Sequence, residues 1–538
     1  MNRSQRTNAG ALAARRDAAA RGRRPTALVA ALVTTVMLVL AACGQTPSIT
    51  LSLDAASAEL LRGSDVQVEV TLTRLGGATA DVALAVTGLP ANVTANFSPA
   101  TLIGGTLIST LTLSADPAAV EGDYAVTVTG TGTGLTATVP LSLEVVSLTV
   151  TGRVVALFES PVSGALVASQ GESGVTDANG EFTLSGLSVP YDLSVWSTAD
   201  NWVHVYEELT ADDLRLAPIA SLLTFSGFTR SADITGTLSG GVTPVPAGQP
   251  VKVCVEGLDG VAMGCGTVTA GGSYAVAAEW SGPATRQVRL HALQVELDGD
   301  NYPVSYPGYA TMDLTVTDTM PSAVNLDLGS ALATSTVDVT IDTPVTIANV
   351  FANVEFGPSF EMPVAVLNTA VTAHEFVMPV IDDASYGFFA FSGTLQAGWV
   401  SDVTSSAATV VVANGPTLVS PIDTATNVTN STVFTSVNPT DGPQTFVWML
   451  AGGPFVALTT MATTSAIPDL AEYGLTFPAA SSSNWQVLGS SGPSAEQGTA
   501  SFADLYNGIL AMVYGASPGS FGNGTVAISD TRAFTTAP

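Results

Sequence analysis

Hydrophobic and polar residues alternate singly along most of this 538-residue chain. Residues 49–53 and 66–72 show the period of two, which sends successive side chains to opposite faces of a β-strand. Glycine pairs at 76–77 and 104–105 interrupt the alternation and are typical of tight turns between strands. Long helical patterns are nearly absent, so the sequence predicts an all-β chain of short strands.

The spacing of strands and turns predicts a tandem array of β-sandwich domains. The arginine-rich and apolar segment 1–42 that precedes the array resembles a cleaved signal peptide. Hydrophobic residues make up 46% of the chain and charged residues 11%, which is enough apolar surface for several cores. The expected segments are a signal peptide at 1–42 and modules at 47–147, 148–220, 228–330, 331–413 and 414–538.

The first module, 47–147, contains the stretch 88–99 followed by Gly122-Asp123-Tyr124. This pattern resembles the bacterial immunoglobulin-like repeats of surface proteins. The cysteine pair that joins the two sheets of antibody domains is missing, so the resemblance implies only the sandwich architecture.

The second module, 148–220, contains Asp177-Ala178-Asn179-Gly180 ahead of a strand that begins Glu181-Phe182. Its motifs resemble the carboxypeptidase regulatory-like domain, an accessory module without a peptidase site. The resemblance implies a transthyretin-like sandwich whose core is filled by Phe182. Asp and Asn side chains can hydrogen-bond the local backbone and glycine permits a positive φ, so we expect a tight turn before this strand.

The third module, 228–330, contains two cysteines on either side of Asp259-Gly260, a strong two-residue hairpin signal. With that turn, Cys254 and Cys265 lie directly opposite each other across the strand pair, within reach of a disulfide. We expect the disulfide; the alternative is two small unlinked residues on neighbouring strands. Residues 331–413 continue the alternation as a β-rich module without a recognisable motif.

The last module, 414–538, resembles a fibronectin type III domain, and the resemblance implies that Trp448 and Trp485 are core tryptophans of facing sheets. An insert of over thirty residues separates the Trp485 strand from the closing strand at 532–536. Apolar residues near its start follow helical spacing. Long inserts in sandwich loops often carry binding surfaces.

The N-terminal segment contains seven arginines and an apolar run, 27–42, that ends in Leu40-Ala41-Ala42-Cys43. This segment resembles a bacterial lipoprotein signal peptide closed by a lipobox. The resemblance implies that cleavage makes Cys43 the first residue and that Cys43 carries a lipid, which anchors the protein to a membrane of the cell envelope, facing the periplasm or the exterior. The alternative is an uncleaved transmembrane helix, but the run is shorter than the roughly 20 residues that span a bilayer.

The chain is acidic, with 45 acids against 16 bases and a net charge of −29. So negative a surface repels phosphate backbones, which excludes nucleic acid as a partner. Lys252 is the only lysine, so the chain has no phosphate-binding loop. We expect no cofactor.

Few residues suggest chemistry. The three histidines, His204, His291 and His374, lie in different expected modules without metal-ligand spacing, so each is interpreted as structural. An aromatic cluster is formed by Trp196, Trp202 and Tyr206, next to acids and amides. It is either a platform for a sugar ligand or packing against a neighbouring module.

Together these features predict a cell-envelope lipoprotein that acts as a non-enzymatic surface binding or spacer protein. Its partners are the membrane, through the lipid, and a carbohydrate or an envelope protein. The first alternative is a carbohydrate-binding lipoprotein. The second is an unrecognised hydrolase, because a carboxylate pair brought together from distant strands leaves no signature in a sequence.

Overall fold

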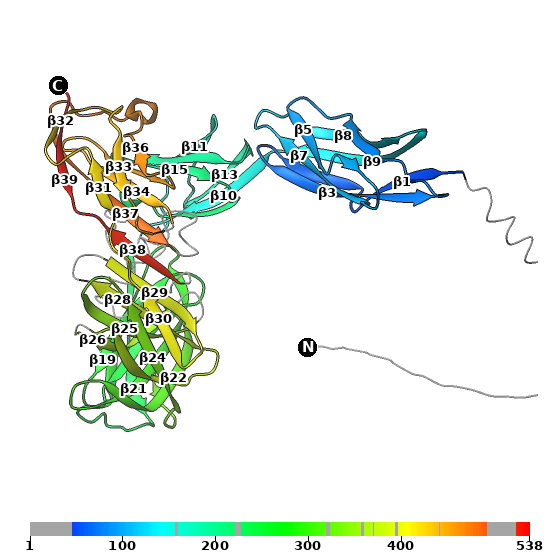
Figure 1. The fold of residues 1–538 in the computed structure, drawn as a ribbon. Coiled ribbons are helices and arrows are strands. Elements are labelled where there is room, and N and C mark those ends of the chain that lie inside the picture. The colour runs from blue at the N-terminus through cyan, green and yellow to red at the C-terminus, as the bar shows by residue number, and fades with distance from the viewer. Residues whose placement is uncertain are drawn as a thin grey trace, which may run out of the picture. The chain divides into compact units, whose positions relative to one another are not determined.

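The computed structural model describes residues 46–156, 160–220, 228–318, 323–356, 360–368, 371–392, 396–440, 442–491 and 523–538. Cys43, with the rest of the N-terminal segment, and most of the expected insert of the last module lie outside these residues. Apart from one short 3-10 helix, every named element is a strand, which confirms the all-β fold class (Figure 1). The chain forms two compact units, one of residues within 1–59, 65–114 and 122–144, the other of 60–64, 115–121 and 145–538.

The first unit is a sandwich of two sheets, with the strand orders β1-β3-β7-β5 and β2-β9-β8-β4-β6. In the middle of its long strands β3 and β8, every second residue is buried, as the alternation predicts. The strands are β1 (Ser48–Leu53), β2 (Ser57–Leu61), β3 (Asp65–Leu75), β4 (Val82–Thr87), β5 (Val93–Ser98), β6 (Thr101–Leu102), β7 (Ile108–Ala115), β8 (Gly122–Gly132) and β9 (Leu135–Val146).

The second unit begins with a sandwich in which β10, β13 and β16 cover one end of a larger sheet. Its strands are β10 (Leu148–Val154), β11 (Leu166–Ser169), β12 (Glu172–Val175), β13 (Glu181–Leu187), β14 (Tyr191–Ser197), β15 (Trp202–Leu209) and β16 (Asp213–Leu216).

The turn expected before β13 is present. The Asp177 carboxylate accepts hydrogen bonds from the backbone N–H groups of Asn179 and Glu181, at 2.8 and 2.9 Å. Gly180 adopts a φ of 77°, where a side chain would be strained. Phe182 is buried in the core against Gly152, whose missing Cβ leaves room for the ring.

The next seven strands form one sheet, in the order β22-β21-β18-β19-β20-β17-β23, that curves around its own core. The sequence predicted a two-sheet sandwich here; the sheet is continuous because β19 pairs with both β18 and β20. The strands are β17 (Arg230–Ser239), β18 (Val251–Gly257), β19 (Ala262–Val268), β20 (Ser273–Trp280), β21 (Thr285–Leu297), β22 (Pro303–Thr317) and β23 (Leu326–Asp327).

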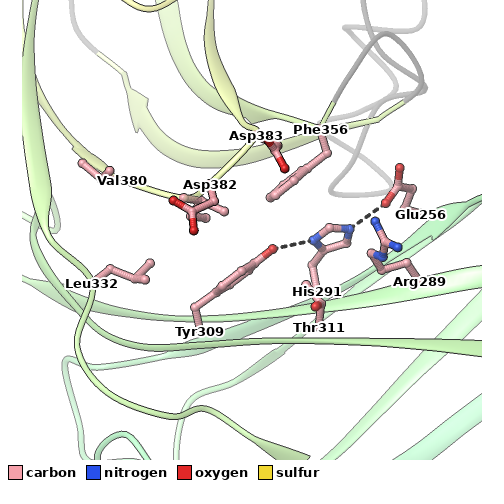
Figure 2. Close-up of a pocket in the computed structure, with 11 residues that line it drawn as sticks. Glu256, Arg289, His291, Tyr309, Thr311, Leu332, Phe356, Val380, Asp382 and Asp383 are labelled. Carbon is pink, nitrogen blue, oxygen red and sulfur yellow. Dashed lines mark hydrogen bonds and ion pairs between the residues drawn. The ribbon is translucent and has the colours of Figure 1, made fainter. Parts of the chain in front are cut away.

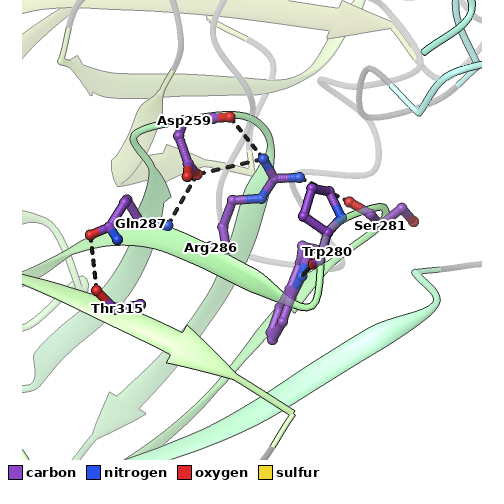
Figure 3. A network of polar contacts seen from close by, with 7 residues as sticks. Asp259, Trp280, Ser281, Arg286, Gln287 and Thr315 are labelled. Atoms are coloured by element: carbon purple, nitrogen blue, oxygen red, sulfur yellow. Dashed lines mark hydrogen bonds and ion pairs between the residues drawn. The ribbon is translucent and has the colours of Figure 1, made fainter. Parts of the chain in front are cut away.

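The cysteine hairpin forms as the sequence predicts. Cys254 is in register with Cys265, and the two form a disulfide with their Cα atoms 4.2 Å apart. Figure 3 shows how the turn is held: the buried Arg286 donates to the backbone oxygen of Asp259 at 2.8 Å, and the Asp259 carboxylate accepts from the N–H of Gln287 at 3.0 Å. These contacts tie the tip of the hairpin to β21.

The following module packs β24, β27 and β30 over β25, β26, β28 and β29, with an apolar core between the layers. Its strands are β24 (Thr334–Asp342), β25 (Ile347–Glu355), β26 (Glu361–Leu367), β27 (Ala373–Pro379), β28 (Ser385–Ser392), β29 (Gln396–Val403) and β30 (Ala407–Val411).

The last module packs the sheet β31-β33-β36 over β34, β35 and β37. Its elements are β31 (Thr417–Ser420), β32 (Ala425–Val428), β33 (Phe434–Val437), β34 (Gln444–Met449), β35 (Phe455–Thr460), β36 (Thr464–Ser465), the 3-10 helix η3 (Leu470–Tyr473), β37 (Ser482–Ser491), β38 (Gly524–Ile528) and β39 (Arg532–Thr536).

The expectation that Trp448 and Trp485 lie on facing sheets is wrong. They are paired in register on the adjacent strands β34 and β37, so both side chains leave the same face of one sheet. The opposite sheet contributes Phe434, whose ring centroid lies 5.3 Å from that of Trp448 and 5.0 Å from that of Trp485.

A fourteen-stranded sheet runs through three of the modules. Strand β15 pairs in parallel with β35, from Trp202 opposite Phe455 to Tyr206 opposite Thr459. At the other edge of the last module, β38 lies between β37 and β29 (Figure 1). The last module in sequence is therefore placed between two earlier ones.

Candidate functional site

A pocket of about 530 Å³ lies where the seven-stranded sheet meets the module of β24–β30 (Figure 2). One wall comes from β18, β21 and β22. The other comes from the loop 380–383, which connects β27 to β28, and from Phe356 at the end of β25. We take this pocket as the candidate functional site of the described residues, since small-molecule sites are concave and typically of this size.

Strand alternation explains which side chains reach the pocket. In β21, Leu290 and Ala292 are buried in the core of the seven-stranded sheet, so Arg289 and His291 project from the opposite face. In β18, Glu256 is in register with Arg289 and lines the same face.

A hydrogen-bonded chain of three side chains crosses the pocket wall. The Nε2 of His291 lies 2.8 Å from a carboxylate oxygen of Glu256, and its Nδ1 lies 2.9 Å from the hydroxyl of Tyr309. A carboxylate only accepts, so Nε2 carries the hydrogen and donates to Glu256. In the neutral ring, Nδ1 then accepts from the Tyr309 hydroxyl.

Burial keeps the His291 imidazole neutral and the Tyr309 phenol protonated. His291 is 1% exposed, and desolvation lowers its pKa below the ordinary 6.5, although Glu256 acts in the opposite direction. Burial also raises the pKa of the Tyr309 phenol above its ordinary value of 10.0. At neutral pH the imidazole is therefore uncharged and the phenol keeps its proton.

The charged side chains that line the pocket are mainly acidic. Asp382 and Asp383 are exposed and line the loop wall, and Figure 2 shows both across from Tyr309 and His291. The guanidinium of Arg289 is held by the Asp313 carboxylate through two contacts of 2.6 and 2.9 Å. The positive charge of Arg289 is thus already paired.

Aromatic rings cover the imidazole. The ring of Phe356 lies 4.1 Å from that of His291, and Phe360 lies 5.2 Å away, centroid to centroid. Behind them, Cys254 and Met362 belong to a buried cluster that joins the seven-stranded sheet to β26. The disulfide hairpin therefore supports one wall of the pocket.

A second polar cluster lies in β25 and β26, where Glu355 and Glu361 are in register. They are only 4% and 7% exposed. Desolvation, with help from Glu361, raises the pKa of Glu355 to about 8, and its carboxyl accepts from the N–H of Asp402 at 2.7 Å. This pair is buried in the module and does not line the pocket.

Protein covers most of the aromatic cluster that the sequence left as either a sugar platform or packing against a neighbouring module. Trp202 and Tyr206 are 2% and 0% exposed and belong to their own module's core. Trp196 packs edge-on against Tyr473, with ring centroids 5.3 Å apart. The structure therefore does not support the sugar-platform interpretation, because the rings that would stack on a sugar already contact protein.

The sequence did not point to the pocket residues. His291 was interpreted as structural, and its partners Glu256 and Tyr309 come from two other strands. The one local signal was the alternation of β18, which places Glu256 two residues after Cys254 on the same face.

The described residues contain neither a metal-binding cluster nor a membrane-spanning helix. In the described part of the chain, no group of three or more His, Cys, Asp or Glu residues is arranged to hold a metal ion. Among the same residues, no helix is long and apolar enough to cross a membrane.

Comparison with known proteins gives no family. No family model matches the chain, and no curated protein matches it. Among solved structures, domains 4 and 5 of the S-layer protein SbsC match at 20% identity and a TM-score of 0.16, covering 19% of this chain and about half, 53%, of that chain. Domains 4–9 of the same protein match at 10% identity and a TM-score of 0.15, covering 91% of this chain and 83% of that one.

The N-terminal four Ig domains of Dscam1 match at 7% identity and a TM-score of 0.15, covering 68% of this chain and 100% of that one. TM-scores this low give no information about the function of this protein. The fold class rests on the strands of this chain itself.

Proposed function

We propose that this protein is a cell-envelope lipoprotein that acts as a non-enzymatic surface binding or spacer protein built of β-sandwich modules. The observation that carries the proposal is the fourteen-stranded sheet. Rows of backbone hydrogen bonds from β15 to β35 and from β38 to β29 hold three modules as neighbours in one sheet. A body joined in this way keeps whatever it displays at a fixed distance, which suits a spacer or display protein.

The lipid anchor is supported by sequence alone. Leu40-Ala41-Ala42-Cys43 follows an arginine-rich start and an apolar run. The disulfide between Cys254 and Cys265 agrees with export, because oxidising compartments outside the cytosol allow such bonds to persist.

The non-enzymatic part is supported by the state of the polar groups. Among the three hydrogen-bonded side chains Glu256, His291 and Tyr309, the one hydroxyl is that of Tyr309. Its raised pKa keeps it protonated, so it is a poor nucleophile. Glu355 and Glu361 are too deeply buried for a substrate to reach them. Trp202 and Tyr206 are in the core, so they do not support the carbohydrate-binding alternative. The insert of the last module, the other place where that alternative put the contact, lies outside the described residues.

The anchor is tested by growing cells that express the full-length protein with a labelled fatty acid. We expect the wild-type protein to incorporate the label and to sediment with membranes, and Cys43→Ala to lose both. Thr46→Ala, a change of similar size three residues away, is the matched control. Label that persists in Cys43→Ala would refute the lipoprotein assignment.

The non-enzymatic assignment is tested by incubating the full-length protein with panels of peptide, ester and glycoside substrates. We expect no turnover. Reproducible turnover that Glu256→Gln or Glu355→Gln abolishes, without loss of folding, would overturn this part of the proposal.

A further inference from the structure

We propose that the pocket lined by Glu256, Tyr309 and the loop 380–383 binds a small organic cation with an ammonium or guanidinium head. This inference goes beyond the proposed function and does not depend on the lipid anchor. A protein that fails the acylation test can still bind such a ligand, and the reverse also holds.

The polar groups of the pocket that remain available only accept hydrogen bonds, so a ligand must donate them. Both ring nitrogens of His291 are occupied by Glu256 and Tyr309. The Tyr309 hydroxyl has given its single hydrogen to His291, so it offers only lone pairs to a ligand. The carboxylates of Asp382 and Asp383 also only accept. An ammonium or guanidinium head supplies the donors that these groups lack.

Charge favours a cation over an anion or a neutral ligand. Glu256, Asp382 and Asp383 place three carboxylates around the pocket, and its one guanidinium, that of Arg289, is paired with Asp313. The rest of the chain adds to the field, since its net charge is −29. Low-dielectric walls strengthen such an attraction relative to open solvent.

Aromatic faces add a second source of affinity for a cation. Phe356 and Tyr309 both line the pocket, on opposite walls. A cation within about 6 Å of an aromatic ring is attracted by the negative face of the ring. Aromatic rings next to carboxylates suit an organic cation, which has both a charge and apolar surface.

Size favours an organic cation over a metal ion. The pocket volume of about 530 Å³ lies within the roughly 300–1,000 Å³ of small-molecule sites. A bare metal ion fills only a small part of that space, and the described acids near the pocket are not grouped as metal ligands.

The experiment measures binding to the full-length protein by ligand-observed NMR and calorimetry at low ionic strength. The probes are propylammonium, methylguanidinium, methylurea, which is the neutral isostere of methylguanidinium, and glucose. We expect saturable binding of propylammonium or methylguanidinium, about tenfold or more tighter than binding of the neutral isostere, and weaker binding as salt is added. The comparison between the two cations shows which head group the pocket prefers.

Variants locate the binding. Combined Asp382→Asn and Asp383→Asn changes should weaken cation binding about tenfold, and asparagine tolerates the positive φ of 62° at residue 383. Combined Asp338→Asn and Asp342→Asn changes remove the same number of charges at exposed positions of β24 outside the pocket. This double variant is the matched control and should leave affinity unchanged.

Four results would overturn the inference. They are no saturable binding of either cation, equal binding of the neutral isostere, binding of glucose alone, and an equal loss of affinity in the control that combines Asp338→Asn and Asp342→Asn.

Discussion

Lowering the pH should destabilise the junction between β15 and β35 through one buried imidazole, that of His204. The ring is 1% exposed, and its Nε2 lies 2.8 Å from the hydroxyl of Thr459 on the partner strand. The N–H of Ile219 donates to Nδ1 at 3.4 Å, so Nε2 carries the hydrogen and donates to Thr459. A proton added at Nδ1 would break the contact with Ile219 and bury a charge.

The size of the effect follows from proton binding in the two states. Burial lowers the pKa of His204 from 6.5 to about 3. Between these values the unfolded chain binds a proton that the native chain does not. The contribution of His204 to stability is therefore complete above about pH 6.5 and is lost as the pH falls, by about 1.4 kcal/mol per pH unit. Between pH 7 and pH 5 the free energy of unfolding should fall by about 2 kcal/mol.

The assay is urea unfolding of the full-length protein at the two pH values, followed by tryptophan fluorescence, in the wild type and in His204→Gln. Other titrating groups contribute to both proteins, so the difference between the two pH-induced losses isolates His204. We expect the wild type to lose about 2 kcal/mol more than the variant. An equal loss in both proteins, or an NMR titration in which the His204 ring gains its proton between pH 7 and 5, would refute the reasoning.

Three further predictions concern stability. Replacing Cys254 and Cys265 together with alanine should lower the free energy of unfolding by roughly 3 kcal/mol, because the bond closes a short loop, and thiol titration of the unfolded, unreduced wild type should detect no free thiol. Phe434→Ala should cost about 3–5 kcal/mol in urea unfolding, since the ring packs between two core tryptophans; a cost near zero would contradict that packing. Glu355→Gln should raise stability relative to the wild type as the pH rises from about 4.5 to 8. Between these pH values the native wild type keeps a proton on Glu355 that the unfolded chain has released, so the stability of the wild type falls as the pH rises, and the glutamine variant lacks this loss. Urea unfolding at several pH values measures the difference, and the absence of this trend would contradict the burial of Glu355.

Local features of the chain were predictable because their causes are local. Alternation places Phe182 and Leu184 of β13 on one buried face, as the structure shows. The turn at Asp177 follows from the side-chain chemistry of that residue. The register that brings Cys254 opposite Cys265 follows from a two-residue turn and the spacing of two adjacent strands.

Interpretations that depended on distant partners were less successful. Trp202 and Tyr206 are residue types that often form a platform for a ligand. Whether an aromatic ring is exposed to a ligand depends, however, on which parts of the protein pack over it. Trp448 and Trp485 were expected on facing sheets, whereas antiparallel pairing of β34 with β37 puts them on the same face. Alternation gives the face of a strand, and it does not give the neighbour of that strand.

By itself, the sequence determined the all-β class, the tight turns and the disulfide hairpin, since each arises from residues close together in the chain. The tertiary structure alone decided that β15 pairs with β35 and that Glu256, His291 and Tyr309 meet in one pocket. The physical reason is that any strand edge offers the same backbone hydrogen-bonding groups, so the choice of partner depends on the packing of whole modules. Glu256, His291 and Tyr309 become neighbours through the pairing of β18 with β21 and of β21 with β22 in one sheet.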